Sequence, residues 1–194
     1  PMKIRTCEFI AGIATDTKEL ESPFLSSDIP KIAFIGRSNV GKSSLINALT
    51  NSSIARASSL PGSTQQINLF LINGTYHLVD LPGYGFARGS LGGRFAINNL
   101  IDNYLLNPKF SQKKVVLIID ASVGMTDRDE SMFHELRKLQ KDVVIAASKI
   151  DKMTQSDRHH KIAALQEMAG DYPVFPISST EKSGIDALRD ALFE

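Results

Sequence analysis

The stretch Gly36-Arg37-Ser38-Asn39-Val40-Gly41-Lys42-Ser43 decides the fold of this chain. It has the pattern G-x-x-x-x-G-K-S, it follows an apolar run at residues 32–35, and a helical pattern begins directly after it at Ser44. A phosphate-binding loop requires this order of strand, glycine-rich loop and helix, because N–H groups of the loop and of the first helical turn surround the phosphate. We therefore predict that residues 36–44 bind a nucleoside triphosphate. The alternative is a chance match in a glycine-containing loop.

Two side chains at the end of this loop have predicted chemical roles. The ammonium group of Lys42 can place its charge on the β- and γ-phosphates, which makes it a candidate catalytic residue. The hydroxyl of Ser43 is a suitable oxygen ligand for Mg²⁺.

The composition limits the classes of protein that need to be considered. The 194 residues, 42% hydrophobic and 22% charged, predict one domain over residues 1–194, with residues 1–30 as an N-terminal strand and connection. A net charge of +1 provides no basic field for DNA, so an RNA partner would need a local patch. The single cysteine, Cys7, and the lack of a long apolar run or signal peptide predict a cytoplasmic protein without membrane contact.

Apolar runs of strand length alternate with helical patterns along the chain. Strands are predicted at residues 4–14, 32–35, 66–72, 75–80, 115–120, 143–148 and 174–178, with helices after most of them. This alternation predicts a doubly wound α/β fold with a mostly parallel sheet. The Asn73-Gly74 turn predicts a hairpin that makes one edge strand antiparallel. Ligands of such sheets bind beyond the carboxyl ends of the strands.

A second motif, Asp80-Leu81-Pro82-Gly83, lies at one of these carboxyl ends and has the pattern D-x-x-G. The Asp80 carboxylate can hold Mg²⁺ directly or through water, and the Gly83 N–H can reach a γ-phosphate, which makes Gly83 a second candidate catalytic residue. A simple Pro-Gly turn after a strand is the alternative.

The segment between the two motifs is rich in serine at residues 51–63 and contains Thr64. The hydroxyl and N–H of Thr64 can close over Mg²⁺ and the γ-phosphate, so we predict it as a metal ligand and a catalytic residue of a switch loop. A plain polar surface loop is the alternative.

A third motif, Ser148-Lys149-Ile150-Asp151, predicts which base is bound. The Asp151 carboxylate can accept hydrogen bonds from N1–H and the 2-amine of guanine, whereas adenine offers no such donors. The stem of Lys149 can cover the base, and a backbone N–H from Ser178-Ser179-Thr180 can reach guanine O6. These residues predict GTP and GDP as ligands. They disfavour an ATP-using P-loop kinase.

The residues in and around these motifs resemble those of the EngB (YihA/YsxC) family of bacterial ribosome-biogenesis GTPases. The resemblance runs from about residue 8 to the end and rests on residues 36–49, on Pro61-Gly62-Ser63-Thr64-Gln65 and on Asp80-Leu81-Pro82-Gly83-Tyr84-Gly85. It implies a P-loop NTPase G-domain with a six-stranded sheet and about five helices. It also implies GTP/GDP and Mg²⁺ as cofactors, with Gly62 and Ser63 among the nucleotide-binding residues.

The resemblance further implies a switch in assembly of the large ribosomal subunit, and hence in cell growth and division. The partner would be that subunit or its precursor, through rRNA and ribosomal proteins. Two departures stand out: Ser148 occupies a position where the family usually has Thr, and residues 121–126 lack the Arg-His-Pro of many relatives. Another ribosome-assembly GTPase of the same superfamily is therefore an alternative.

The residue after the D-x-x-G motif bears on hydrolysis. Ras-like proteins have a water-orienting glutamine where this chain has Tyr84, and a phenol is a poor substitute for an amide. We therefore expect slow intrinsic hydrolysis, with a binding module that has no meaningful turnover as the alternative. Asn39 matches the asparagine that helps hold K⁺ in potassium-activated relatives, although it could equally cap or brace the loop.

Two further groups of basic residues have less specific interpretations. Lys109, Lys113 and Lys114 cluster before a predicted strand and, on the resemblance alone, are candidates for rRNA contacts; a solvated face is the alternative. His159 and His160 are adjacent on a predicted helix and are interpreted as solvated.

Overall fold

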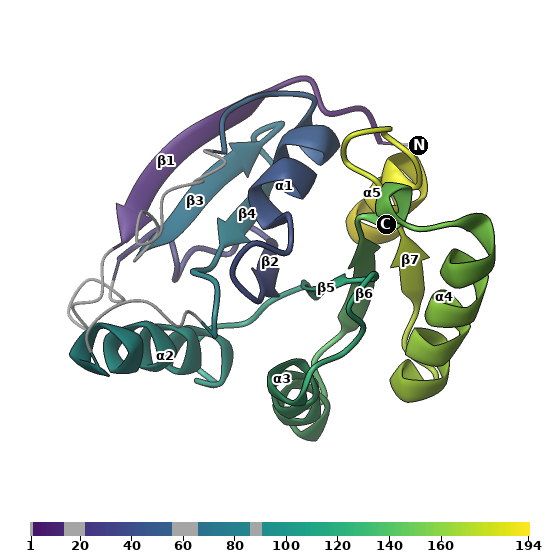
Figure 1. Cartoon of the computed structure of the whole chain (residues 1–194). Coiled ribbons are helices and arrows are strands. Elements are labelled where there is room, and N and C mark those ends of the chain that lie inside the picture. Colours follow the sequence, from purple (N-terminus) through teal and green to yellow (C-terminus); the bar gives the residue numbers. More distant parts are fainter. Residues whose placement is uncertain (1, 14–21, 56–65, 86–90) are drawn as a thin grey trace.

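The computed structural model describes residues 2–13, 22–55, 66–85 and 91–194, with only the backbone for residues 91–97. The strands are β1 (Cys7–Ile13), β2 (Lys31–Gly36), β3 (Ile67–Ile72), β4 (Tyr76–Asp80), β5 (Lys114–Asp120), β6 (Val143–Ser148) and β7 (Val174–Pro176). The helices are α1 (Lys42–Thr50), α2 (Leu91–Leu105), α3 (Asp127–Lys138), α4 (Gln155–Ala169) and α5 (Ile185–Phe193), with a short 3₁₀ helix, η2 (Ile150–Lys152) (Figure 1). The predicted α/β class is confirmed, and the five α-helices of the described residues agree with the predicted number.

The strands form one seven-stranded sheet in the order β1-β3-β4-β2-β5-β6-β7. The six strands implied by the family resemblance are therefore one too few, whereas the apolar runs of the sequence predicted each of the seven. β3 pairs antiparallel with both β1 and β4, and the remaining neighbours pair parallel. The antiparallel strand is consequently second from the edge, not at the edge as predicted, because β1 returns along its outer side.

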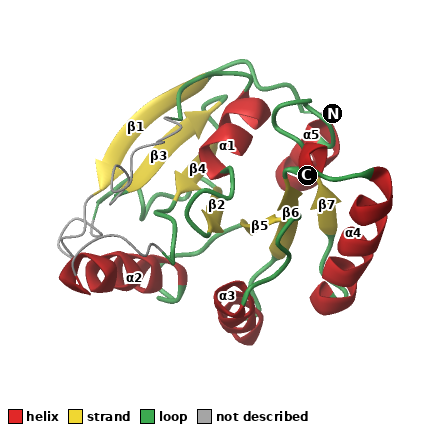
Figure 2. Ribbon diagram, viewed as in Figure 1, coloured by secondary structure: helices red, strands yellow, loops and turns green. Residues whose placement is uncertain are grey.

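Helices cover both faces of the sheet (Figure 2). One core cluster joins the strands to α2, α3 and α4 through residues such as Tyr104, Leu136 and Leu165. The other joins them to α1 and α5 through residues such as Leu45 and Leu188. Every residue of β2 and β6 is buried, because these strands are packed on both faces and bordered by neighbours on both sides.

The parallel strands place four strand ends at the same edge of the sheet. Gly36 ends β2, Asp80 ends β4, Asp120 ends β5 and Ser148 ends β6. Asp120 and Ser148 are direct register partners, so the last residues of β5 and β6 lie side by side. The predicted ligand edge therefore holds all three motifs of the sequence.

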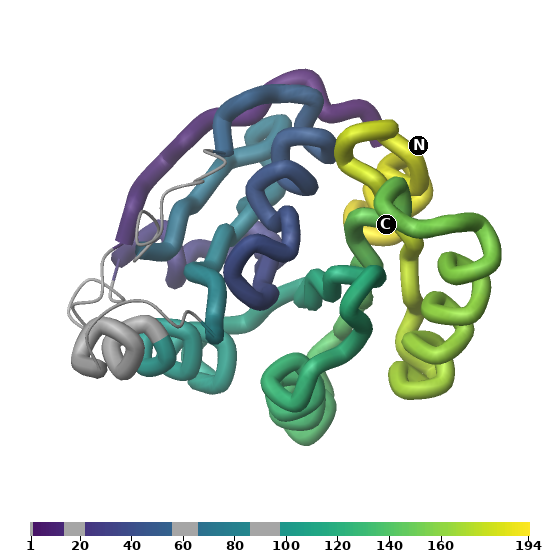
Figure 3. Tube along the Cα trace, in the orientation of Figure 1, coloured from purple at the N-terminus to yellow at the C-terminus, as the bar shows by residue number. Residues whose placement is uncertain are grey.

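The two ends of the chain lie close to α5 (Figure 3). Met2 and Ile4 pack against the core cluster that contains Leu192 and Phe193. Within the described ranges, none of the helices combines the length and the apolar character needed to cross a membrane.

Candidate nucleotide-binding site

The phosphate loop leads into α1 through two residues with left-handed backbone angles. Asn39 has φ 67° and Gly41, the N-cap of α1, has φ 96°. No side chain caps the N-terminus of α1, and its first turn carries no acidic residue. The N–H groups and the positive end of the helix dipole at Lys42 are therefore suited to an anion.

Gly36 is required by close packing at the start of the loop. A Cβ atom there would lie 2.8 Å from the Ile118 carbonyl oxygen and 2.9 Å from Cγ2 of Val40. Val40 is itself only 2% exposed, so its contribution to a ligand would come from its backbone. Arg37 and Ser38 complete the loop and are partly exposed, as are Lys42 and Ser43, whereas Ser44 is exposed.

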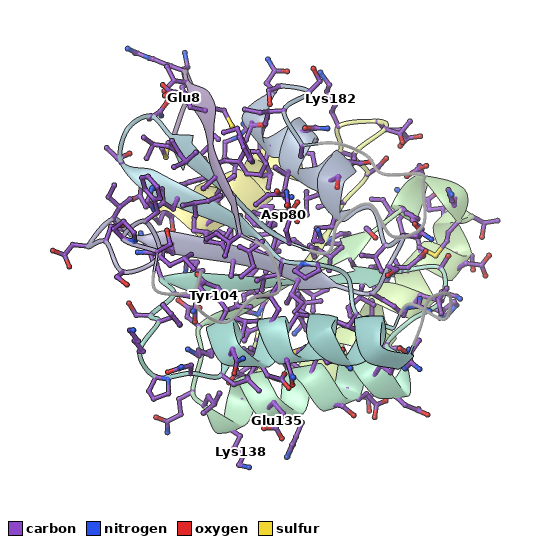
Figure 4. The ribbon with its side chains drawn as sticks, turned by 90° about the vertical axis from the view of Figure 1, so that its left-hand side faces the viewer. Glu8, Asp80, Tyr104, Glu135, Lys138 and Lys182 are labelled. Carbon is purple, nitrogen blue, oxygen red and sulfur yellow. The ribbon has the colours of Figure 1, made fainter. Side chains whose placement is uncertain are left out.

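Lys42 belongs to the phosphate loop and Asp80 to the D-x-x-G motif, and the structure brings the two side chains together as an ion pair. Their side chains are only 10% and 4% exposed. Asp80 lies inside the molecule, whereas Glu135 and Lys138 extend outward from α3 (Figure 4). The predicted phosphate-binding ammonium group and the predicted metal-binding carboxylate can thus serve one ligand.

The loop at residues 80–84 packs directly on the phosphate loop. A Cβ atom at Gly83 would lie 3.0 Å from Cα and 3.1 Å from the backbone nitrogen of Ser38. The Ser38 N–H donates to the Tyr84 carbonyl oxygen at 3.0 Å, and the Tyr84 N–H donates to the Gly36 carbonyl oxygen at 3.2 Å. Leu81 is fully buried in the core, so this residue, like Val40, can contact a ligand only through its backbone. Pro82 lies between it and Gly83.

The base-side loop at residues 148–151 contacts the phosphate loop through side chains. The hydroxyl of Ser148, 3% exposed, donates to the Val40 carbonyl oxygen at 2.7 Å. The Lys149 ammonium donates to the Asn39 carbonyl oxygen at 2.7 Å, and its Cε lies 4.0 Å from where a Cβ of Gly41 would stand. Ser148, which stands where the family usually has Thr, therefore uses its hydroxyl to join the base-side loop to the phosphate loop. Ile150 is buried and Asp151 is partly exposed, both within η2.

Asp120 belongs to this site although sequence analysis did not select it. Its Oδ2 accepts from the Lys149 ammonium at 2.7 Å, and its Oδ1 accepts from the N–H and hydroxyl of Ser122 at 3.0 and 2.6 Å. Burial alone would raise the pKa of the Asp120 carboxyl, but the bonds from Lys149 and Ser122 outweigh burial and hold the pKa below its ordinary value. The signal available in the sequence was an aspartate at the carboxyl end of an apolar strand.

The turn after β7 limits which of the residues 178–180 can donate a backbone N–H to guanine O6. Ser178 is fully buried, and its N–H and carbonyl oxygen exchange hydrogen bonds with Ser183 at 3.0 and 3.1 Å. The Ser178 hydroxyl accepts from the Glu181 N–H at 3.0 Å. Since the Ser178 N–H is already donated, the predicted contact to guanine O6 falls to Ser179 and Thr180, which are partly exposed and exposed.

The remaining predicted residues include the switch loop and the metal ligands. Gly62, Ser63 and Thr64 lie outside the described residues, as do all residues of the predicted switch loop from 56 onward. Ser43 and Asp80 supply a hydroxyl and a carboxylate, and among the described residues no cluster of three or more His, Cys, Asp or Glu could hold a metal. Mg²⁺ needs only one or two ligands from the protein, because it keeps several bound waters and also binds phosphate oxygens. The donor set therefore fits that ion.

Asn39 presents an exposed side chain and a left-handed backbone. Asparagine tolerates this conformation better than other residues with a Cβ, so the backbone provides a further reason for asparagine here. The K⁺ contact stays a prediction.

The basic residues outside the site are partly used within the fold. Lys113 donates to the Glu194 carbonyl oxygen at 3.0 Å, and Lys114 pairs with Asp142 at 2.8 Å. Lys109 is exposed, with its ammonium 5.9 Å from the Phe110 ring centroid. His159 and His160 are both exposed, as their interpretation as solvated residues predicted.

Comparison with known proteins gives the same assignment as the motifs. Residues 31–149 match the family model described as "50S ribosome-binding GTPase". The probable GTP-binding protein EngB of Clostridium perfringens is 40% identical over 197 residues, covering 100% of this chain and 97% of that protein. That of Thermotoga maritima is 39% identical over 165 residues and covers 84% of each.

Solved structures agree with this result. A crystal structure of a probable GTP-binding protein EngB superposes with a TM-score of 0.67 at 27% identity, covering 84% of this chain and 96% of that one. Era of Aquifex aeolicus, solved with GDP and AlF₄⁻, shares the fold with a TM-score of 0.68 at 23% identity, covering 83% of this chain and 55% of Era. The match to the Clostridium perfringens protein covers the whole of this chain, and the chain belongs to the EngB family of GTP-binding proteins within the P-loop GTPase superfamily.

Proposed function

We propose that this protein is a GTP-dependent switch in assembly of the large ribosomal subunit. It binds GTP and GDP with Mg²⁺ in one domain, hydrolyses GTP slowly on its own, and contacts the subunit or its precursor when loaded with GTP. Cell growth and division depend on it through ribosome supply. The work of such a switch takes place in the cytoplasm.

One observation carries the proposal: the two other motifs, at residues 80–84 and 148–151, both contact the phosphate loop. The Ser148 hydroxyl and the Lys149 ammonium bond to carbonyl oxygens of that loop, while Tyr84 bonds to its backbone from the other side. A loop held between a base-side and a phosphate-side motif suits a nucleoside triphosphate, and Asp151 beside Lys149 favours guanine.

Each residue has a defined task in this proposal. The N–H groups at the start of α1 and the Lys42 ammonium bind the β- and γ-phosphates. The Gly83 N–H, and Thr64 on the switch loop, orient the γ-phosphate. A bound Mg²⁺ ion would be held by Ser43 and Asp80, with Thr64 as a further ligand. Its positive charge would stabilise the phosphate oxygens.

The ribosomal partner is supported by the family rather than by a basic surface. The matching family model is described as a 50S ribosome-binding GTPase. Of the three lysine side chains in this cluster, only the Lys109 ammonium has no hydrogen bond or ion pair to another described residue. We therefore expect a partner contact that depends on nucleotide state more than on a general attraction to RNA.

A second function, nucleotide-dependent binding without meaningful turnover, is favoured by one specific contact. The Tyr84 hydroxyl donates to the buried Asp129 carboxylate, so it cannot orient the attacking water while it makes this bond. Slow multiple-turnover release of phosphate, stimulated by ribosomal particles, would exclude this function.

Sedimentation with purified large subunits and their precursors tests the proposal. The protein loaded with a non-hydrolysable GTP analogue should sediment with the particles, and the GDP form should remain largely in the supernatant. Lys42→Ala should lose both nucleotide binding and sedimentation, while Lys109→Ala should retain nucleotide binding. Equal sedimentation with GTP analogue, with GDP and for Lys42→Ala would exclude a nucleotide-dependent switch.

A further inference from the structure

Tyr84, the residue that follows the D-x-x-G motif, points into the protein. Its side chain is 5% exposed, and its hydroxyl donates to Oδ1 of Asp129 at 2.6 Å. This contact joins the phosphate-side loop to α3, an element 45 residues further along the chain. The site described above makes no use of it.

Asp129 is the buried centre of this contact. It is 1% exposed and lies in the first turn of α3. Its second oxygen, Oδ2, accepts from the N–H and the hydroxyl of Thr126 at 2.9 and 2.7 Å, which forms a capping box. A buried carboxylate needs such donors, so the position of the Tyr84 hydroxyl relative to α3 is closely determined.

The backbone of Tyr84 is bonded to the phosphate loop at the same time. Residues 37 and 84 form a parallel β-bridge, with hydrogen bonds to the neighbouring Gly36 and Ser38. Gly85 next to it has φ 78°, and a Cβ there would lie 2.9 Å from Nη1 of Arg128 at the start of α3. Tyr84 therefore connects the phosphate loop, Gly83 and the N-terminal turn of α3 through a single residue.

We propose that Tyr84 and Asp129 are positioning residues, which hold Gly83 in place for the γ-phosphate and couple that contact to the N-terminal turn of α3. The inference rests on the proposed function, because it takes the Gly83 N–H to contact the γ-phosphate. GDP lacks this group, so the Tyr84–Asp129 contact stabilises the triphosphate complex selectively. By reciprocity, binding of GTP stabilises the first turn of α3.

Tyr84→Phe tests the coupling with the smallest chemical change. We expect affinity for a non-hydrolysable GTP analogue to fall about tenfold, as loss of a hydrogen bond to a charged acceptor predicts, and affinity for GDP to change less than twofold. Hydrogen exchange at residues 126–130 should be slower with the GTP analogue than with GDP in the parent protein. This difference should disappear in the variant.

Tyr104→Phe is the matched control. Tyr104 is fully buried in the same core cluster, and its hydroxyl has no hydrogen-bond partner in the described part of the chain. Removal of this hydroxyl should leave the ratio of the two affinities and the exchange pattern unchanged.

Thr126→Ala separates stability from positioning. It removes the other side-chain donor to Asp129 and the helix cap, so thermal stability should fall, but the Tyr84 hydrogen bond remains. If the affinity ratio falls in Thr126→Ala as much as in Tyr84→Phe, the role of Tyr84 is only structural and the inference is wrong. An unchanged ratio in Tyr84→Phe also overturns it.

The same titrations distinguish this failure from that of the proposed function. Lys42→Ala should weaken both nucleotides. If it does, and the ratio in Tyr84→Phe equals that of the parent, then GTP binding stands and only the inference fails. If Lys42→Ala binds like the parent, the proposed function fails as well.

Discussion

The base-side loop at residues 148–151 and the phosphate-side loop at residues 80–84 reach the same phosphate loop by different means. The base-side loop uses side chains: the Ser148 hydroxyl and the Lys149 ammonium donate to Val40 and Asn39 carbonyl oxygens, both at 2.7 Å. The phosphate-side loop uses its backbone and the close approach of Gly83 to Ser38.

This difference indicates which changes each region tolerates. A side-chain contact can be weakened in steps, by removal of a methyl group, a hydroxyl or a charge. A backbone contact is insensitive to most substitutions but is lost when an added Cβ forces the chains apart. We therefore expect graded effects on both nucleotides from the base side. The phosphate side should show few effects, concentrated on the triphosphate.

Asp151→Asn should have the largest effect on nucleotide affinity and should remove only the guanine contacts of the base-side loop. The amide can no longer accept both guanine hydrogen bonds, so affinity for GTP and for GDP should each fall about thirtyfold. Preference should shift toward xanthosine triphosphate, whose 2-carbonyl complements the amide. Competition titrations with the three nucleotides measure this, with the exposed Asp171→Asn as control. Unchanged GTP affinity would mean that guanine is not recognised by Asp151.

Gly83→Ala should disturb only the contacts of the phosphate-side loop. The new methyl group would stand 3.0 Å from Cα of Ser38, where the phosphate loop must move to accept it. Affinity for a GTP analogue should fall about tenfold, while GDP affinity changes little, because the predicted γ-phosphate contact is lost. Gly124→Ala, where nothing lies within 4 Å of the added methyl group, is the control for an alanine that makes no close contact. Equal losses for both nucleotides would contradict the distinction between the two loops.

Ser148→Ala should lower affinity for GTP by less than the two preceding variants. Loss of the hydroxyl leaves the buried Val40 carbonyl oxygen without its donor, so affinity for both nucleotides should fall about fivefold. Ser148→Thr keeps a hydroxyl and should bind nearly as tightly as the parent. A loss in Ser148→Thr as large as that in Ser148→Ala would show that the side chain's size, not its hydrogen bond, is what the base-side loop needs.

The pH dependence of the Lys149–Asp120 pair should show the smallest effect. The folded-state pKa of Asp120 lies below its ordinary value, so the pair stabilises the fold fully above the unfolded pKa of about 4 and loses that contribution as pH falls through the folded pKa. The free energy of unfolding of the parent should exceed that of Asp120→Asn by about 0.5–1 kcal/mol from pH 7 to 5. Urea unfolding measures this difference.

The difference should shrink as the pH falls below about 4. Asp142→Asn, which removes a more exposed partner of a lysine, should show a smaller difference throughout. A difference between parent and Asp120→Asn that grows on acidification would contradict the assigned direction of the pKa shift.

The strands and helices were largely predictable because apolar periodicity is a local property. The runs at residues 115–120 and 143–148 became β5 and β6 with almost the same bounds. The place of the antiparallel strand was not predictable in the same way. Whether β3 lies at the edge depends on whether the N-terminal strand pairs with it, a contact between segments about 60 residues apart.

The nucleotide motifs were predictable because a phosphate, a metal ion and a guanine base each demand particular atoms at short spacing along the chain. Gly36, Lys42, Asp80 and Asp151 could be selected on that ground alone. Asp120 could not, because its role depends on the register that places it beside Ser148 and within reach of Lys149.

The α/β class, the phosphate loop and the preference for guanine could all be inferred from residue types and their local order along the chain. The role of Tyr84 became clear only from its contacts in the folded protein. Its position after the D-x-x-G motif predicted a weak substitute for a water-orienting glutamine, whereas the fold buries its ring and bonds its hydroxyl to Asp129. A buried hydroxyl needs a partner, and which carboxylate meets it is decided by the packing of α3 against the sheet.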